Sequence, residues 1–340
     1  MSTTSQVTDF SDLFTDLQNR VRVTTAISAT ETQAKRYINT ALQDMHLGTD
    51  YKLPWAERRA VLRTHDDYTT GTIDVSIGST TVTGTSTLWT TANSYSENNA
   101  RTTGKMLIGG GSDPYRITTV GSATSITLTD RYVATSAADD ATYIYFEDEY
   151  ALASDFLRPI DMQSFSDDLD IPLIDRKEFR RRYPRPNVSG RPRVACLLDL
   201  GFSGSSTPVR RVQFWPYPDS TYLIPYTYVT ANLAVSSAGV EATALSANTD
   251  EPIVPLRYRH LLVMRALADW YRDKKDDSRA NDALGAYTDG MLRLLGDVET
   301  GTNRSWLRPR IGSYWSAAKA PYRRGGTSRY DINDRFDRME

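Results

Sequence analysis

Hydrophobic residues recur at helical spacing near the beginning of the chain. Between residues 28 and 48, apolar side chains return every three or four positions, with Ser28 or Thr30 as a capping residue and Gly48 as a stop. The positions of this stripe are Ala34, Tyr37, Ile38, Ala41, Leu42 and Met45. A shorter amphipathic segment comes before it, with apolar positions at Phe10, Leu13, Phe14 and Leu17. The pattern predicts a helix over 28–48 and a shorter one ahead of it.

Two further helical patterns lie near the other end. One begins after Pro255, a residue type favoured in the first turn of a helix, and its apolar positions are Leu261, Met264, Ala268 and Tyr271. The second stripe consists of Ala280, Ala283, Leu284, Tyr287, Met291, Leu294, Leu295 and Val298. Because only the polar corner DKKDD (273–277) separates the two, we expect an antiparallel helical hairpin. The helix over 28–48 is the expected third member of a small bundle.

Alternating β patterns fill the sequence between these helices. From residue 71 to residue 150 the chain is rich in Thr, Ser, Gly and Val, in short alternating runs separated by turn residues. These runs predict a self-contained β module, inserted between expected strands around 59–63 and 151–158. A second β region is expected over about 191–233. Before it, LIDRKEFRRRYPRP (173–186) predicts one or two helical turns that end at a proline.

The stretch QFWPYPDSTYLIPYTY (213–228) places aromatic residues on both sides of a turn sequence. Its two ends favour strands, because aromatic and β-branched side chains pack well on a pleated, half-buried surface. Pro216 and Pro218 cannot donate backbone hydrogen bonds, so the segment from Trp215 to Ser220 is expected to form the turn. The stretch therefore predicts a β-hairpin.

The last forty residues combine basic and aromatic side chains without a sustained period. Nine Arg or Lys residues and three Asp residues lie between Arg304 and Arg338. Disordered linkers are poor in aromatic residues, because aromatic rings bury too much apolar area to stay solvated. We therefore expect this segment to dock on a surface that is acidic or rich in acceptors. A disordered terminus is the alternative.

Together these patterns predict an α+β protein with four parts. The parts are a small helical bundle, a β region, an inserted Thr/Gly-rich β-barrel or sandwich module, and an extended C-terminal arm. The expected boundaries are 1–70 for the first helices and first core strand, 71–150 for the inserted module, 151–250 for the second β region of the core, 251–300 for the helical hairpin and 301–340 for the arm.

Composition and charge argue against several classes of function. Forty basic and 42 acidic residues leave a net charge of −2, which argues against capture of nucleic acid or anionic lipid by the whole molecule. Any such contact has to be local. Cys196 is the only cysteine, which excludes an internal disulfide and fits a reducing compartment. The sequence has neither a signal-peptide pattern nor 18 consecutive apolar residues, so we expect neither export by the usual route nor a membrane anchor.

No catalytic motif is complete in this sequence. GFSGSS (201–206) lacks the second Gly of a nucleophile elbow, and GGGSDP (109–114) lacks the Lys-Ser/Thr ending of a phosphate loop. Both are typical of turns between strands. Paired carboxylates for glycoside cleavage stay open, because they need no fixed spacing.

Metal-binding patterns are also incomplete, and no cofactor is expected. DDLD (167–170) lacks the Gly and the downstream Glu of an EF-hand, which favours a solvated acidic loop over a calcium site. The histidines lack the spacing of zinc ligands, so surface or hydrogen-bonded roles are expected for His46, His65 and His260.

A run of three arginines lies within the helical turns expected over 173–186. Arg180, Arg181 and Arg182 either meet phosphate groups or form a helix face paired with Glu178 and neighbouring acids. Both interpretations remain open. RNA binding by the arginines of the tail is a weaker option, because the chain lacks a strongly basic domain.

The order of the elements resembles that of the head-to-tail adaptor proteins of short-tailed bacteriophages. The likeness covers roughly residues 28–62 and 155–300. Its most specific parts are the strand-Pro-x-Pro-Asp-strand pattern of VQFWPYPDSTYLIPYTYV and the helix after Pro255, which ends with Ala268, Trp270, Tyr271 and Asp273. The Thr/Gly-rich insert departs from the compact adaptors and is similar to small β modules of several phage structural proteins.

The resemblance implies a structural virion protein and not an enzyme. Twelve copies are expected to form a ring beneath the portal, with helices around a channel that passes double-stranded DNA without sequence readout. Each arm would dock along the portal protein, and the β regions would face the tail nozzle or tail fibres. The protein would be assembled in the host cytoplasm and reside at the portal–tail vertex. A cell-wall (peptidoglycan) hydrolase and a receptor- or glycan-binding tail component are the alternatives.

The candidate site residues form three sets. The portal-binding set in the arm is Trp306, Arg308, Arg310, Tyr314, Trp315, Tyr322, Arg323 and Arg324. The set expected at a subunit or tail interface is Phe214, Trp215, Tyr217, Tyr222 and Tyr226. Rigid aromatic side chains supply large contact area at low entropy cost, which suits permanent interfaces. The DNA-facing candidates are Arg180, Arg181 and Arg182.

Overall fold

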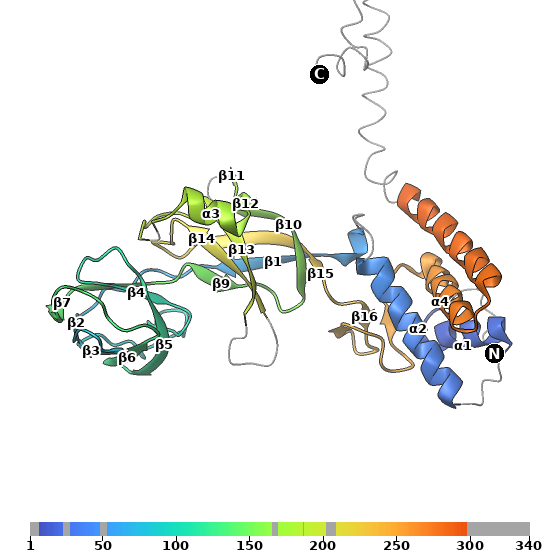
Figure 1. Ribbon diagram of the computed structural model, residues 1–340, viewed down its shortest axis with the longest axis horizontal. Coiled ribbons are helices and arrows are strands. Elements are labelled where there is room, and N and C mark those ends of the chain that lie inside the picture. Colours follow the sequence, from blue (N-terminus) through green and yellow to red (C-terminus); the bar gives the residue numbers. More distant parts are fainter. Residues whose placement is uncertain are drawn as a thin grey trace, which may run out of the picture. The chain divides into compact units, whose positions relative to one another are not determined.

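The computed structural model describes residues 7–22, 28–47, 53–164, 169–185, 187–201 and 209–297 (Figure 1). The chain divides into two compact units, which we call the helical unit (Met1–Ala56 with Asn232–Glu340) and the β unit (Glu57–Ala231). Both β regions therefore belong to one inserted body, whereas the sequence predicted that only 71–150 was inserted. The chain is a mixed α+β protein.

The helical unit contains the helices that the apolar stripes predict. They are α1 (Phe10–Val21), α2 (Ser28–Leu47), α4 (His260–Asp273) and an unlabelled helix over residues 277–297, drawn in orange in Figure 1. Asp9 caps α1 by accepting a hydrogen bond from the backbone N–H of Asp12 at 2.9 Å. The α1 stripe is buried, and α1, α2 and α4 contact one another.

The last two helices form the predicted antiparallel hairpin. A Cβ atom added at Gly290 would lie 2.1 Å from Cδ2 of Leu261, so the two helices approach closely at that point. Leu261 lies near the start of α4, whereas Gly290 lies late in the helix over 277–297. The two helices therefore run in opposite directions, and the close approach depends on a residue without a side chain.

A small three-stranded sheet completes the helical unit and was not predicted. Its order is β17 (Glu241–Ala242), β16 (Ala234–Val235) and β18 (Glu251–Pro252). Each strand has two residues, too few to show an alternating pattern. A backbone hydrogen bond joins this segment to the helices: the N–H of Phe10 donates to the carbonyl of Asp250 at 2.8 Å. Short 3-10 turns, η1 (Pro54–Ala56) and η2 (Leu256–Tyr258), also lie in this unit.

In the β unit, two four-stranded sheets share one core and form a sandwich. The first sheet has the order β1 (Glu57–Arg63), β15 (Leu223–Thr230), β10 (Phe156–Ser164) and β11 (Leu169–Asp170). The second has the order β12 (Leu173–Ile174), β13 (Val194–Gly201), β14 (Val209–Trp215) and β9 (Glu149–Ala151). Buried residues of both sheets meet in a single cluster that includes Leu62, Tyr150, Val212, Phe214, Ile224 and Tyr226.

The Thr/Gly-rich segment forms one curled antiparallel sheet of seven strands, which we call the β module (Figure 1). Its order is β7 (Ala138–Ala141), β2 (Thr72–Val75), β3 (Thr81–Thr85), β6 (Ser125–Leu128), β5 (Tyr115–Ser122), β4 (Lys105–Ile108) and β8 (Tyr143–Phe146). Trp89 fills its core and donates its indole N–H to the Tyr143 hydroxyl at 3.0 Å. The expected β module is present as a sheet with its own core, although it belongs to the same compact unit as the sandwich.

The hairpin predicted over residues 213–228 is wrong. β14 and β15 are consecutive in the chain, but β14 pairs with β13 and β9, whereas β15 pairs with β1 and β10. The segment between them therefore crosses from one sheet of the sandwich to the other. Its two prolines still act as predicted, because they interrupt strand pairing.

Candidate functional site

The aromatic set expected at an interface is mostly core. Phe214, Tyr217 and Tyr226 have 2%, 3% and 5% of their surfaces exposed, and Tyr217 stacks on Phe146 with ring centroids 4.1 Å apart. Side chains buried in this way stabilise their own unit and cannot contact a second molecule directly. This corrects the expectation for these three residues.

The other two members of that set are half-buried. Trp215 stacks on Tyr183 with ring centroids 4.2 Å apart and donates its indole N–H to the carbonyl of Arg185 at 3.1 Å. Tyr222 donates its hydroxyl to Asp219 at 2.6 Å and lies under the guanidinium of Arg191. These two rings keep some exposed surface, so a role in contacts with another molecule stays a prediction.

The three arginines of the DNA-facing set lie on the short helix α3 (Arg176–Arg182). Asp175 caps the helix, and buried Phe179 anchors it against Val194 and Cys196. We call the exposed side chains of this region the basic patch: Arg176, Lys177, Arg180, Arg181, Arg182 and Arg185.

The interpretation as a salt-bridged helix face holds for Arg182 alone. Arg182 pairs with Glu178 at 2.6 Å, as the salt-bridged helix face requires. In the described ranges, Arg180 and Arg181 form no ion pair with any acidic side chain. The exposed guanidinium groups of Arg180 and Arg181 therefore have no acidic side chain of the described residues in contact with them. They are open to an anionic partner.

The eight candidate residues of the arm, from Trp306 to Arg324, lie outside the described residues, and their role stays a prediction.

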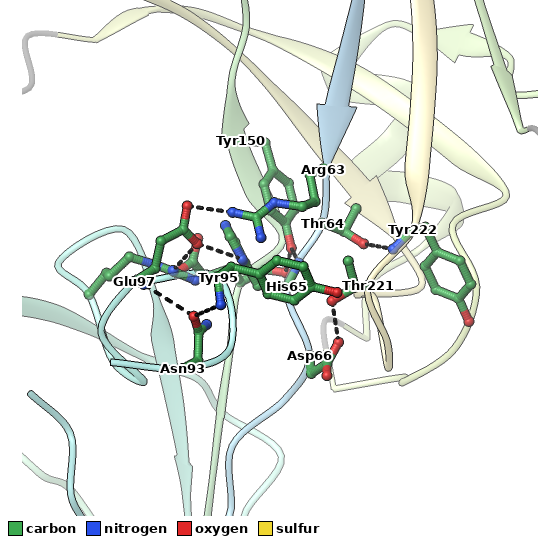
Figure 2. A network of polar contacts seen from close by, with 12 residues as sticks. Arg63, Thr64, His65, Asp66, Asn93, Tyr95, Glu97, Tyr150, Thr221 and Tyr222 are labelled. Atoms are coloured by element: carbon green, nitrogen blue, oxygen red, sulfur yellow. Dashed lines mark hydrogen bonds and ion pairs between the residues drawn. The ribbon is translucent and has the colours of Figure 1, made fainter. Parts of the chain in front are cut away.

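A polar network that sequence reasoning missed joins the β module to the sandwich (Figure 2). Arg63, at the end of β1, pairs with Glu97 at 2.5 Å and lies over the Tyr95 ring at 4.2 Å. Arg101 bridges Glu97 at 2.8 Å and Glu147 at 2.6 Å. We call Arg63, His65, Glu97, Arg101 and Glu147 the junction network.

His65 occupies the centre of the junction network. Its Nδ1 lies 3.2 Å from the Glu97 carboxylate, and its ring stacks on Tyr150. The backbone N–H of His65 also donates to the Tyr150 hydroxyl at 3.2 Å. Figure 2 shows His65 between Glu97 and Tyr150, with side chains from β1 on one side and from the β module on the other.

Burial lowers the pKa of His65, and the nearby positive charge of Arg101 lowers it further. The carboxylates of Glu147 and Glu97 oppose this effect, and Arg63 adds to it. The net direction is downward, so the imidazole is neutral at pH 7. When the imidazole is neutral, the two positive charges of the arginines equal the two negative charges of the glutamates in the network.

Acidification should therefore weaken the β unit. The pKa of His65 is lower in the folded state than in the unfolded chain, so the unfolded state binds the proton more readily between those two values. Stability is greatest above about pH 6.5 and falls as the pH drops from there through the folded pKa. Each tenfold difference in proton affinity between the two states corresponds to about 1.4 kcal/mol.

Urea unfolding of the β unit between pH 7.5 and 5 tests this expectation. We expect H65Q to flatten the pH dependence across that range. H260Q, which removes an exposed histidine from the helical unit, is the control. An equally steep loss of stability in H65Q would contradict the assignment.

A second cluster of charges is buried where the β module rejoins the sandwich. Lys105 on β4 contacts Asp148 at 2.7 Å and Glu149 at 2.9 Å, and all three side chains are at most 7% exposed. Gln213 donates to Asp148 at 2.7 Å, and Arg116 pairs with Glu149. Burial alone would raise the pKa of Glu149, but Lys105 and Arg116 lie so close that the pKa is lowered overall. Two buried carboxylates thus depend on one buried ammonium.

No pattern in the amino-acid sequence would have grouped these residues. His65 and Glu97 are 32 positions apart, and Lys105 lies 43 positions before Asp148. The one local signal was the acidic run EDE (147–149) directly after an apolar strand, because three successive carboxylates at a buried strand end require cations.

The remaining nucleophile and metal candidates have ordinary structural roles. Burial raises the pKa of the Cys196 thiol to about 11, so the thiol stays protonated at neutral pH and is a poor nucleophile. In the part of the chain that the structure describes, no group of three or more His, Cys, Asp or Glu side chains is arranged to hold a metal ion. His46 is buried in α2, and His260 is exposed at the start of α4.

Comparison with known proteins identifies no relative: no family model matches the chain, and no curated protein matches it. Among the described residues, no helix has both the length and the apolar character to cross a bilayer.

Proposed function

We propose that the protein is a structural head-to-tail adaptor of a short-tailed bacteriophage. In this proposal about twelve copies form a ring that joins the portal to the tail and extends the DNA channel. The observation that carries it is the division of one chain into two bodies with different architectures. An adaptor has to contact two different structures at once, and a helical unit carrying an inserted β unit gives it one body for each.

The proposal assigns the portal side to the helical unit and the tail side to the β unit. The basic and aromatic arm follows directly after the helix over 277–297, so it is covalently part of the helical unit. Aromatic and arginine side chains dominate the energetics of many protein interfaces, which suits the arm for docking on the portal. The inserted β unit is held by buried charge clusters, which suits a body that transmits force without changing shape.

The basic patch supports passage of DNA in this proposal. The uncompensated guanidinium groups of Arg180 and Arg181 are suited to phosphate oxygens, and no sequence-reading motif accompanies them. DNA held in this way is contacted through its backbone and can slide.

Replacing both arginines should weaken DNA binding without changing sequence preference. We expect the R180A/R181A variant to lose affinity for random duplex DNA and to reduce the slope of log K against log salt by roughly two. Fluorescence anisotropy at several salt concentrations measures both quantities. R272A/R293A removes two exposed arginines from the helical unit and is the matched control. An unchanged salt slope in R180A/R181A would exclude the basic patch from DNA contact.

The assembly itself is tested by mass. Mass photometry of the full chain mixed with its portal protein should give a complex that contains close to twelve copies of the 38.2 kDa chain. If this chain stayed monomeric in the presence of the portal protein at micromolar concentration, the adaptor assignment would be contradicted.

A further inference from the structure

The junction between the β module and the sandwich contains a small cleft that no part of the proposed function uses. It has a volume of about 150 Å³ and lies beside His65. Its walls come from the segment after β1, from the loop over 93–101 of the β module and from the segment before β15. Four of the residues that line it, Asp66, Asn93, Tyr95 and Thr221, are labelled in Figure 2.

The walls of the cleft are held by hydrogen bonds that its lining residues make with one another and with neighbouring residues. Asn93 accepts hydrogen bonds from the backbone N–H groups of Tyr95 at 2.9 Å and Glu97 at 3.1 Å, which holds the loop in shape. Asn99 donates to the carbonyl of Leu88 at 3.0 Å, and Thr221 donates to Asp66 at 2.7 Å. A preformed site loses little conformational entropy when it binds a ligand.

One carboxylate in the cleft has spare hydrogen-bonding capacity. Asp67 is half-buried and accepts a hydrogen bond from its own backbone N–H, and no other described residue donates to it. Burial raises its pKa, and the nearby carboxylates of Asp219 and Asp66 raise it further. A ligand that donates hydrogen bonds would satisfy this group without adding negative charge.

An aromatic ring also lines the cleft. Tyr95 is 50% exposed, and Arg63 covers one face of its ring. An exposed ring fixed from behind offers a rigid apolar surface next to polar groups. The cleft thus combines carboxylate, amide and hydroxyl groups with an aromatic ring. These groups match a ligand with hydroxyl groups on its edges and C–H groups on its face.

Other classes of ligand fit less well. The cleft is smaller than the roughly 300–1,000 Å³ of sites for extended small molecules, so only one small ring fits. Phosphate is disfavoured because Asp66 and Asp67 line the cleft, while the guanidinium of Arg101 is already paired with Glu97 and Glu147. A metal ion is also disfavoured, because the described residues contain no group of three or more His, Cys, Asp or Glu side chains that could hold one.

We propose that this cleft binds one uncharged sugar ring of a glycan, with Asp67 and Asn99 taking its hydroxyl groups and Tyr95 packing against its C–H face. The site gives the β unit a way to contact a cell-surface or capsular glycan. It does not depend on ring assembly, so the failure of either proposal leaves the other standing.

Ligand-observed NMR on the full-length protein tests the proposal. The probes are the methyl glycosides of glucose, galactose, mannose, rhamnose and N-acetylglucosamine, each examined by saturation transfer. We expect at least one glycoside to bind, and D67A and Y95A each to weaken that binding at least tenfold. D67N, which keeps the shape of the side chain, checks that a loss does not reflect unfolding. D113A removes an exposed aspartate elsewhere on the β module and should bind as the unaltered protein does.

Three outcomes would overturn the sugar assignment. The first is that no glycoside gives saturation transfer. The second is that a glycoside binds equally well to D67A, Y95A and the unaltered protein, which would place it outside the cleft. The third is that every glycoside fails to bind while an arginine-rich peptide binds in an Asp67-dependent manner. That result would make the cleft a docking site for a protein.

Discussion

Replacing Lys105 with methionine is expected to destabilise the β unit by about 3–5 kcal/mol, because it leaves two buried carboxylates without their shared cation. Methionine has nearly the length of lysine, so the loss reflects charge and not a cavity. Hydrogen exchange of the β4 and β8 amides measures the effect, since these strands pair directly at Lys105 and Phe146.

Two comparisons make this prediction specific. R116A removes the other cation near Glu149, but Arg116 is 58% exposed, so its loss should cost only about 0–1 kcal/mol. K105M combined with D148N and E149Q removes the stranded charges and should recover much of the stability. If K105M proved as mild as R116A, the buried cluster would not be what fastens the β module to the sandwich.

Ending the chain after residue 301 is expected to reduce binding to the portal protein roughly a thousandfold, because interfaces draw most of their energy from a few aromatic and arginine side chains. The truncated chain keeps every described residue of both units, so its helices and sheets should remain folded. A pull-down with immobilised portal protein measures the loss, and circular dichroism checks the fold.

A milder variant separates the chemistry of the arm from its length. W306A/W315A keeps all 340 residues and should lose most of the same affinity, whereas S305A/S313A should bind normally. Portal binding that survives both the truncation and the double tryptophan variant would assign docking to another surface.

The helices of this protein could be predicted because their signal is local. In α1, four apolar positions within eight residues were enough to define a buried stripe. The β module was equally clear, because its Thr- and Val-rich runs alternate and are separated by turn residues. The pairing of β14 and β15 failed because sheet membership is decided by contacts far apart in sequence. An aromatic strand, a proline turn and a second aromatic strand are also compatible with a crossing between two sheets.

The candidate site was harder to predict for the same reason. Phe214 and Tyr226 were expected at an interface because aromatic content alone does not distinguish a core from a contact surface. His65 was assigned an ordinary role because no second ligand lay near it in sequence, and its contacts with Glu97 and Tyr150 depend on how the β module folds back on β1. Arg180, Arg181 and Arg182 were recognised as a candidate site because they are consecutive in the sequence.

The central claim is that copies of this chain form a ring on the portal, and electron microscopy of the full-length protein mixed with portal protein tests it most directly. The account predicts class averages in which a ring of about twelve subunits sits coaxially on the portal and continues its channel. Portal particles that remain bare beside single copies of this protein would contradict it.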